Sequence, residues 1–228
     1  MNPLIVALDF DSDIKALALA DQLDPQDCAL KVGHELFTRY GPQLVRSLMD
    51  RQFRIFLDLK FHDIPNTVSR ACAACADLGV WMMNVHALAG SAAMESARRA
   101  LEPYGDERPL LIAVTVLTSM NEFDLSAVNL NSSPERQVEL LAQLALASGL
   151  DGVVCSAHEV PNIKSLCGTD FVTVTPGIRL PGNAMDDQKR IVTPAMARQL
   201  GSDYWVVGRP ITRSDNPLEV IHAILHSK

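Results

Sequence analysis

Two hydrophobic patterns alternate along the whole chain. Short runs of consecutive apolar residues are typical of strands buried on both faces, and the longer stretches between them have the periodicity of helices. Strands are predicted at Leu4–Asp9, Ala29–Val32, Arg54–Lys60, Trp81–His86, Leu110–Val116, Gly152–Cys155, Phe171–Thr175 and Tyr204–Val207. Helices are predicted near residues 13–22, 35–51, 65–78, 91–102, 134–148, 158–166, 194–200 and 217–226.

The order of these elements predicts the fold. Strands that alternate with helices form a parallel sheet, because each helix returns the chain to the edge where the next strand begins. Eight strand–helix units in 228 residues favour an α/β fold of the TIM-barrel type, an eight-stranded parallel (β/α)₈ barrel, over an open doubly wound sheet. No linker or shift in composition divides the chain, so residues 1–228 are expected to form a single domain.

Composition and charge narrow the possible partners. The chain carries 20 Lys and Arg against 27 Asp and Glu, a net charge of −7, so neither nucleic acid nor a membrane is an expected partner. No apolar stretch reaches the roughly 18 residues of a membrane span, and the N-terminal segment lacks the basic residues of a signal peptide. Five cysteines at irregular spacing indicate a reducing compartment and predict a cytoplasmic protein.

Metal binding has little support in the sequence. Cys72 and Cys75 have C-x-x-C spacing, but they lie in an Ala-rich helical pattern with no second pair. We interpret them as buried packing residues, with redox or metal chemistry as the alternative. The six histidines show no metal-ligand spacing. His62 and His86 lie near the carboxyl ends of predicted strands but receive no assignment, and no metal site is predicted.

Polar residues at the carboxyl ends of the predicted strands are the candidates for function. In barrels of this type the chemistry lies at that end, where residues from several strands converge on one mouth. The candidates are Asp9, Lys31, Asp58, Lys60, Asp63, Thr118, Arg179, Gly208 and Arg209.

The strongest candidates are the charged residues that follow Ile55-Phe56-Leu57. Alternate residues of a strand share a face, so Asp58 and Lys60 are expected to point the same way, roughly 7 Å apart at Cα. Asp63 follows where the strand passes into a helix. Burying one of these charges without a partner costs several kcal/mol. The pattern therefore indicates a site that holds a lysine charged and aims it.

A second group of candidates follows the last two strands. Arg179 comes after Thr175-Pro-Gly-Ile, and Gly208-Arg209-Pro ends the eighth strand. Barrel phosphate sites are commonly built from these two loops, and two arginines suit a phosphate dianion. The stretch Arg179–Thr193 has no predicted element and is expected to be a lid.

The run Asp58-Leu-Lys-Phe-His-Asp-Ile-Pro-Asn-Thr67 resembles the orotidine 5′-phosphate decarboxylases of the short bacterial type. The likeness extends nearly end to end and includes Val-Ala-Leu-Asp9, Leu-Lys31-Val-Gly, Val-His86-Ala-Leu-Ala-Gly, Thr115-Val-Leu-Thr118-Ser, Thr175-Pro-Gly-Ile-Arg179 and Val207-Gly208-Arg209-Pro. The resemblance implies a barrel homodimer that converts orotidine monophosphate to UMP and CO₂, in UMP biosynthesis, without a metal or an organic cofactor.

The resemblance also implies a role for each site residue. Lys60 is expected to protonate C6 of the pyrimidine, and Lys31, Asp58 and Asp63 complete a charged array with it, Asp63 coming from the partner subunit. Contacts with substrate are expected from Asp9 and the partner's Thr67 to the ribose, from Thr118 and Ser119 to the base, and from Arg179, Gln188, Gly208 and Arg209 to the phosphate.

Three other functions stay open at this point. A Schiff-base aldolase would use Lys60 as a neutral nucleophile, but the neighbouring aspartates favour the charged amine. Related Mg²⁺-dependent phosphosugar enzymes share the D-x-K-x-x-D run but, as the resemblance suggests, have an acidic residue where this chain has Lys31. A barrel that binds nucleotide without catalysis would have no need of the charged array.

Overall fold

Eight parallel strands close into a barrel in the computed structural model, which describes residues 2–180 and 192–227. Each strand pairs with its neighbours in the sequence, and β8 pairs with β1. The strands are β1 (Leu4–Ala7), β2 (Ala29–Val32), β3 (Ile55–Phe61), β4 (Met82–His86), β5 (Leu110–Val114), β6 (Gly152–Val154), β7 (Val172–Thr175) and β8 (Tyr204–Val207). The predicted TIM-barrel fold is confirmed.

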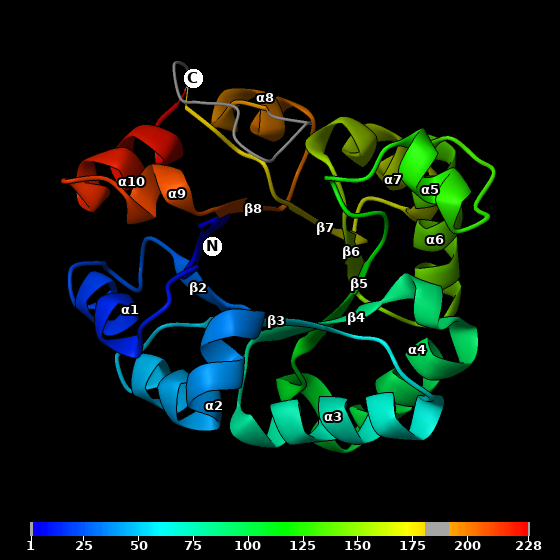
Figure 1. Ribbon diagram of the computed structural model, residues 1–228, viewed down its shortest axis with the longest axis horizontal. Helices are drawn as coiled ribbons and strands as arrows, with labels where there is room; N and C mark the ends of the chain where they lie inside the picture. Colours follow the sequence, from blue (N-terminus) through cyan, green and yellow to red (C-terminus); the bar gives the residue numbers. More distant parts are fainter. Residues whose placement is uncertain (1, 181–191, 228) are drawn as a thin grey trace.

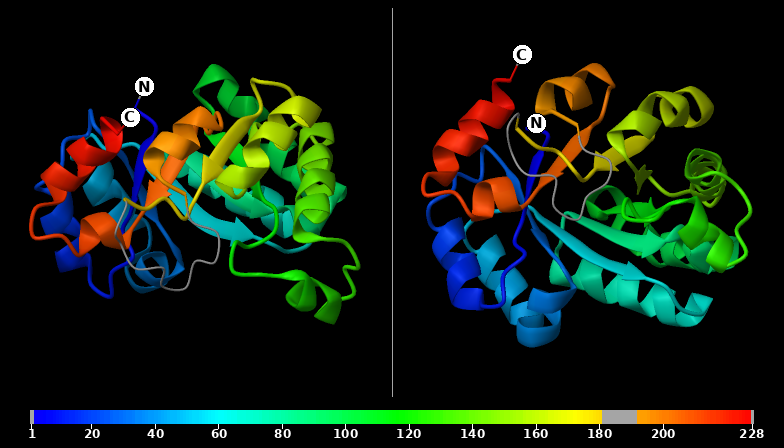
Figure 2. Two further views of the ribbon diagram at one scale, coloured as in Figure 1. Left: turned by 90° about the horizontal axis from the view of Figure 1, so that it is seen from above. Right: turned by 45° about the horizontal axis from the view of Figure 1, so that its top comes forward.

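Helices surround the barrel as an outer ring (Figure 1). They are α1 (Asp13–Ala20), α2 (His34–Met49), α3 (Pro65–Leu78), α4 (Ser91–Ala100), α5 (Glu122–Ala127), α6 (Pro134–Ala147), α7 (Val160–Cys167), α8 (Pro194–Gln199), α9 (Arg209–Thr212) and α10 (Pro217–Leu225). Neither α5 nor α9 was predicted; they have six and four residues. The segment that carries α5 projects from the body of the molecule (Figure 2).

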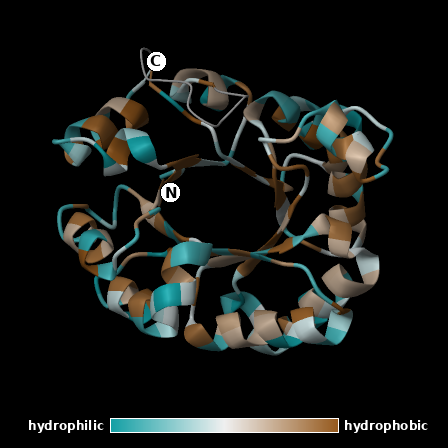
Figure 3. Ribbon diagram, in the orientation of Figure 1, coloured by the Kyte–Doolittle hydropathy of each residue, from teal (hydrophilic) through white to brown (hydrophobic). Residues whose placement is uncertain are grey.

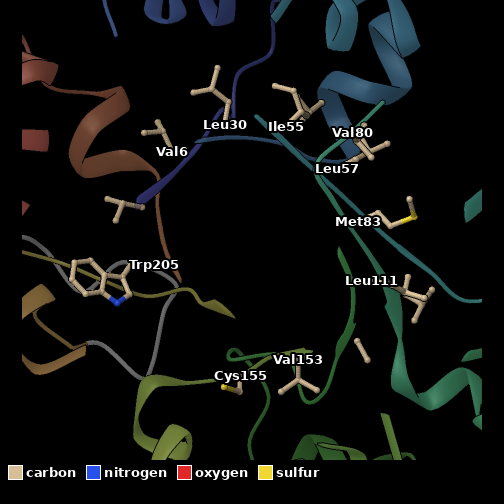
Figure 4. Packing of buried hydrophobic residues seen from close by; sticks show 14 of the residues in the cluster. Val6, Leu30, Ile55, Leu57, Val80, Met83, Leu111, Val153, Cys155 and Trp205 are labelled. Atoms are coloured by element: carbon tan, nitrogen blue, oxygen red, sulfur yellow. The ribbon is translucent and has the colours of Figure 1, made fainter. Parts of the chain in front are cut away.

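The apolar core has two layers, one inside the barrel and one between the barrel and the helices. The strands are largely apolar along their length (Figure 3), and their side chains alternate between the layers. Outward residues such as Leu30, Leu57 and Met83 pack toward the helices (Figure 4). The inner layer is formed by Ile5, Ala7, Ala29, Phe56, Met82, Ile112, Val174 and Val206.

Cys72 and Cys75 lie on the buried side of α3 as free thiols. Burial raises the pKa of each thiol to about 12, so both remain protonated at neutral pH. Their environment fits the packing interpretation. Within residues 2–180 and 192–227, no helix combines the length and the apolar character that crossing a bilayer requires.

Candidate active site

A cavity of about 630 Å³ opens at the carboxyl ends of the strands. The inner apolar layer closes it from below through residues such as Phe56 and Val174. Its polar lining includes most of the candidates from the sequence, namely Asp9, Lys31, Asp58, Lys60, Thr118, Ser119, Arg179, Gly208 and Arg209. The structure therefore brings candidates from six separate stretches of the chain into one site.

Four of these side chains form an alternating row of charges. The Lys31 ammonium lies 3.2 Å from Asp9 Oδ1 and 3.3 Å from Asp58 Oδ2. The Lys60 ammonium donates to Asp58 Oδ1 at 2.7 Å. The observed order is Asp9–Lys31–Asp58–Lys60, so Asp9, which the resemblance assigned to the ribose, also neutralises Lys31.

Asp58 is the centre of this row. Its burial favours the neutral acid, but the two lysines and the amide of Asn84 outweigh this and lower its pKa to about 2. Burial likewise opposes the charge on Lys31, and the carboxylates of Asp58 and Asp9 outweigh it and raise the Lys31 pKa above its ordinary value of 10.5. Both groups are therefore ionised at neutral pH.

Of the two lysines in the row, both of which line the cavity, Lys60 has more donors left for a bound molecule. An ammonium group has three N–H donors, and Asp58 takes one of them. Among the residues that the structure describes, the other two have no hydrogen-bond acceptor. The side chain is 28% exposed, against 11% for Lys31. Lys60 is thus placed to act on a molecule in the cavity, whereas Lys31 is occupied by its two carboxylates.

Asn84 is a site residue that sequence reasoning missed. It is completely buried. Its amide donates to Asp58 Oδ1 at 2.7 Å and accepts from the Lys60 backbone N–H at 2.7 Å. The signal was present in the sequence, since an amide interrupts the otherwise apolar Met82-Met83-Asn84-Val85 in a buried strand.

Two arginines line the cavity beyond β7 and β8 as predicted. Arg179 is 8% exposed, and its guanidinium donates to the Ile178 carbonyl at 3.0 Å. Arg209 begins α9 directly after Gly208. Arg213, which the sequence did not single out, also lines the cavity. This group of cations suits an anionic part of a ligand.

Two predicted site residues lie outside the cavity. Asp63 and Thr67 are exposed at the rim, and the Asp63 carboxylate accepts from the Ile64 backbone N–H at 2.7 Å. The structure does not bring either side chain to the cavity of its own chain. Gln188 and most of the predicted lid at 179–193 fall in the stretch 181–191, outside the described residues.

The two unassigned histidines stack on each other near the mouth. The ring centroids of His62 and His86 are 5.4 Å apart, and His86 Nδ1 accepts from the Leu88 backbone N–H at 3.3 Å. Burial, together with the charges of His62 and Lys60, lowers the pKa of His86 to about 4. His86 is therefore neutral in the folded protein at physiological pH.

The site has few groups of the type that hold metals. In the part of the chain that the structure describes, no three His, Cys, Asp or Glu side chains are grouped as potential metal ligands. Each carboxylate of the row already faces an ammonium within 3.3 Å. Any cation entering beside Asp58 would meet Lys31 and Lys60 first.

Comparison with known proteins decides the family. Residues 2–224 match the family model described as orotidine 5'-phosphate decarboxylase / HUMPS family. The chain belongs to this family. The decarboxylase family resemblance stated from the Asp58–Thr67 run is thus confirmed over nearly the whole chain.

Relatives of the orotidine 5'-phosphate decarboxylase family match at full length. The orotidine 5'-phosphate decarboxylase of Legionella pneumophila (strain Paris) is 59% identical over 226 residues, which cover 99% of each chain. That of Pectobacterium carotovorum subsp. carotovorum (strain PC1) is 57% identical over 223 residues, 98% of this chain and 90% of the relative.

Solved structures agree in fold. The crystal structure of orotidine 5'-phosphate decarboxylase from Lactobacillus acidophilus has a TM-score of 0.87 and 42% identity, covering 98% of this chain and 97% of that one. An uncharacterized conserved protein from Geobacillus kaustophilus has a TM-score of 0.85 and 42% identity, over 98% of this chain and 99% of that one.

Proposed function

We propose that this chain decarboxylates orotidine 5'-phosphate to UMP and CO₂, a step of pyrimidine biosynthesis, with Lys60 as the proton donor. The observation that carries the proposal is the row Asp9–Lys31–Asp58–Lys60 in the cavity of a member of this family. The five free cysteines fit a reducing compartment and support a cytoplasmic reaction.

The chemistry explains why a fixed cation is needed. Loss of CO₂ leaves an electron pair on C6 of the pyrimidine, a vinylic carbon with no carbonyl placed to delocalise it. Stabilisation must then come from charge that is already in position. The Lys60 ammonium opposes the developing negative charge and then gives a proton to C6, and the electron pair of the broken C–C bond forms the new C–H bond.

Asp58 and Lys31 keep that cation in place. One oxygen of Asp58 holds Lys60 and the other holds Lys31, so the Lys60 ammonium enters the reaction without reorganisation. Lys31 also argues against the Mg²⁺-dependent alternative, because its ammonium, 3.3 Å from Asp58 Oδ2, would repel a metal ion at that carboxylate.

The remaining cavity residues take up the rest of the nucleotide. The exposed Asp9 carboxylate accepts from a ribose hydroxyl, Thr118 and Ser119 contact the base, and the phosphate binds to Arg179, Gly208 and Arg209. Gln188, which is outside the described residues, is proposed as a further phosphate contact on the family resemblance alone. The phosphate is remote from C6. Its binding energy therefore serves to organise the site around the reacting carbon, which raises turnover as well as affinity.

We further propose a homodimer in which each cavity is completed by Asp63 and Thr67 of the other subunit. Both residues are exposed at the rim, and neither lines the active-site cavity of its own chain. Ile64 is 67% exposed and Leu88 is 42% exposed on the same rim. These side chains would be buried against a partner, and a two-fold axis would place each rim over the other mouth.

The direct test is a product assay. The purified protein is given orotidine 5'-phosphate, and loss of substrate absorbance is followed together with CO₂ release and UMP formation. One CO₂ and one UMP for each substrate lost supports the proposal. Binding of the nucleotide without turnover identifies the alternative, a barrel that only binds. Trapping of substrate on Lys60 by borohydride identifies a Schiff-base enzyme.

A further inference from the structure

Strand β3 loses its regular pairing with β4 where the reactive lysine lies. Leu57 pairs with Met83, and Phe61 pairs with Val85. Three residues of β3 therefore lie opposite one residue of β4, which is Asn84. A bulge of this kind leaves backbone groups without their ladder partners and turns side chains in new directions.

The bulge puts Lys60 into a backbone conformation that its type rarely adopts. Its φ of 49° lies in the left-handed region, which is unfavourable for a residue with a Cβ. Glycine would adopt this conformation freely, but it has no amine. The surrounding structure must therefore hold Lys60 in this conformation.

The side chain of Asn84 replaces the missing strand contact. Its Oδ1 accepts from the Lys60 backbone N–H at 2.7 Å, and its Nδ2 donates to Asp58 Oδ1 at 2.7 Å. The orientation of the amide is fixed, because a backbone N–H needs an oxygen acceptor and a carboxylate needs an N–H donor. The oxygen that receives Nδ2 also receives the Lys60 ammonium.

Burial makes these contacts difficult to replace. Asn84 has no exposed surface, so without its side chain the Lys60 N–H would lose its acceptor in a place that bulk water does not reach. We propose that Asn84 is a positioning residue for the reaction: it holds the Lys60 backbone and the Asp58 carboxylate and so aims the ammonium at the reacting carbon. This inference rests on the proposed function, since the aim matters only if Lys60 acts on C6.

The test compares Asn84→Ala with wild type. A small misplacement of a catalytic group costs about 10²-fold in rate, so kcat is expected to fall about 10²-fold. Substrate is held mainly through its phosphate, so KM is expected to change less than about threefold. The matched control is Thr173→Val, which removes a different buried side-chain hydrogen bond. The Thr173 hydroxyl donates to Asp203 at 2.8 Å, at the amino-terminal end of the barrel strands. The control is expected to lose stability and keep kcat.

The isosteric variant Asn84→Asp separates the two contacts. It keeps an acceptor for the Lys60 N–H, but it sets a second carboxylate against Asp58. Two carboxylates at hydrogen-bond distance cannot both ionise easily, so one pKa rises. We expect partial recovery of kcat relative to Asn84→Ala below the raised pKa, where the protonated carboxyl donates to Asp58 as the amide does, and loss of that recovery as the pH rises through this pKa.

Crystal structures of the unliganded variants give a readout that does not depend on catalysis. In Asn84→Ala, Lys60 is expected to leave the left-handed region and its ammonium to move from Asp58. If wild type fails to decarboxylate but Lys60 moves as expected, the proposed function is wrong and the positioning by Asn84 stands. An unmoved Lys60, a kcat close to wild type, or a loss of kcat matched by Thr173→Val overturns the inference.

Discussion

The two ends of the barrel both contain partly buried ion pairs, but they use them differently. At the amino-terminal end of the strands, Lys164 lies 2.7 Å from Asp203, and Arg108 forms a two-pronged pair with Asp151 at 2.6 Å. At the carboxyl end lies the row Asp9–Lys31–Asp58–Lys60. Each end has a lysine whose ammonium lies 2.7 Å from an aspartate oxygen. The two lysines differ in how many of their N–H donors the protein itself uses.

The cation Lys164 is saturated by the protein. Its three donors go to Asp203 and to the carbonyls of Thr169 and Phe171, at 2.7 to 2.9 Å. Lys60, by contrast, gives one donor to Asp58 and faces the cavity. A saturated pair fixes the fold, whereas a cation that is held but not saturated can act on a ligand. The number of donors that the protein leaves free on the cation therefore separates an ion pair that can act on a ligand from one that only stabilises the fold.

The largest expected effect comes from removing the cation at the mouth. In Lys60→Ala, both the charge that stabilises the carbanion and the proton donor are lost, so kcat is expected to fall by about 10⁴-fold or more. The matched change at the other end is Lys164→Met. It is expected to lower the free energy of unfolding by about 2 kcal/mol, because Asp203 loses its cationic partner, with kcat within about twofold of wild type.

Steady-state kinetics and urea unfolding of both variants make this comparison. Lys60→Ala should still bind UMP, and its free energy of unfolding should fall no more than that of Lys164→Met, because Asp58 keeps Lys31 and the Asn84 amide. Near-normal turnover in Lys60→Ala, or a loss of turnover in Lys164→Met as large as in Lys60→Ala, would show that the two ends are not divided in this way.

Subunit mixing tests whether one chain supplies all the catalytic groups of a site or whether Asp63 comes from the partner subunit. Lys60→Ala and Asp63→Ala are each expected to be inactive as homodimers. In a statistical mixture half of the dimers are mixed, and each mixed dimer regains one site with both groups, so about a quarter of wild-type activity is expected. The measurement is turnover after denaturation and joint refolding. If subunit exchange is verified by mass and no activity returns, the shared site is wrong.

Removing an arginine of the proposed phosphate site is expected to have the next largest effect. Arg209→Ala is expected to lower kcat/KM for orotidine 5'-phosphate by about 10²-fold, because a charge-assisted contact to the phosphate is lost. The same variant should treat the unphosphorylated nucleoside as wild type does. Competition kinetics with both substrates measure the difference. Equal losses for the two substrates would move Arg209 out of the phosphate site.

The smallest effect concerns stability at low pH. His86 has a pKa of about 4 in the folded protein against an ordinary 6.5. Between these values the unfolded chain binds a proton that the folded chain does not, so falling pH lowers the free energy of unfolding. His86→Gln is expected to make that fall about 1 kcal/mol smaller, after allowance for the partial exposure of the ring. Urea unfolding of wild type and variant across this pH window measures the difference. If the free energy of unfolding falls equally in both proteins, the lowered pKa of His86 is wrong.

Sequence reasoning reached the fold and the polar lining of the cavity for one physical reason. Apolar runs identify strands buried on both faces, and in a closed barrel the carboxyl ends of the strands must meet, which places Lys31, Asp58 and Lys60 together. The role of Asn84 was out of reach, because it depends on the register shift between β3 and β4. Whether Asp63 completes a neighbouring cavity depends on an assembly that one chain does not contain.

The central claim is that a held, unsaturated ammonium performs the decarboxylation without a metal. The most direct measurement is the initial rate of orotidine 5'-phosphate decarboxylation by wild-type protein treated with a chelator, before and after Mg²⁺ is added back. The same rate is expected in the untreated, chelated and Mg²⁺-supplemented samples. A rate that disappears with the chelator and returns with Mg²⁺ would contradict it.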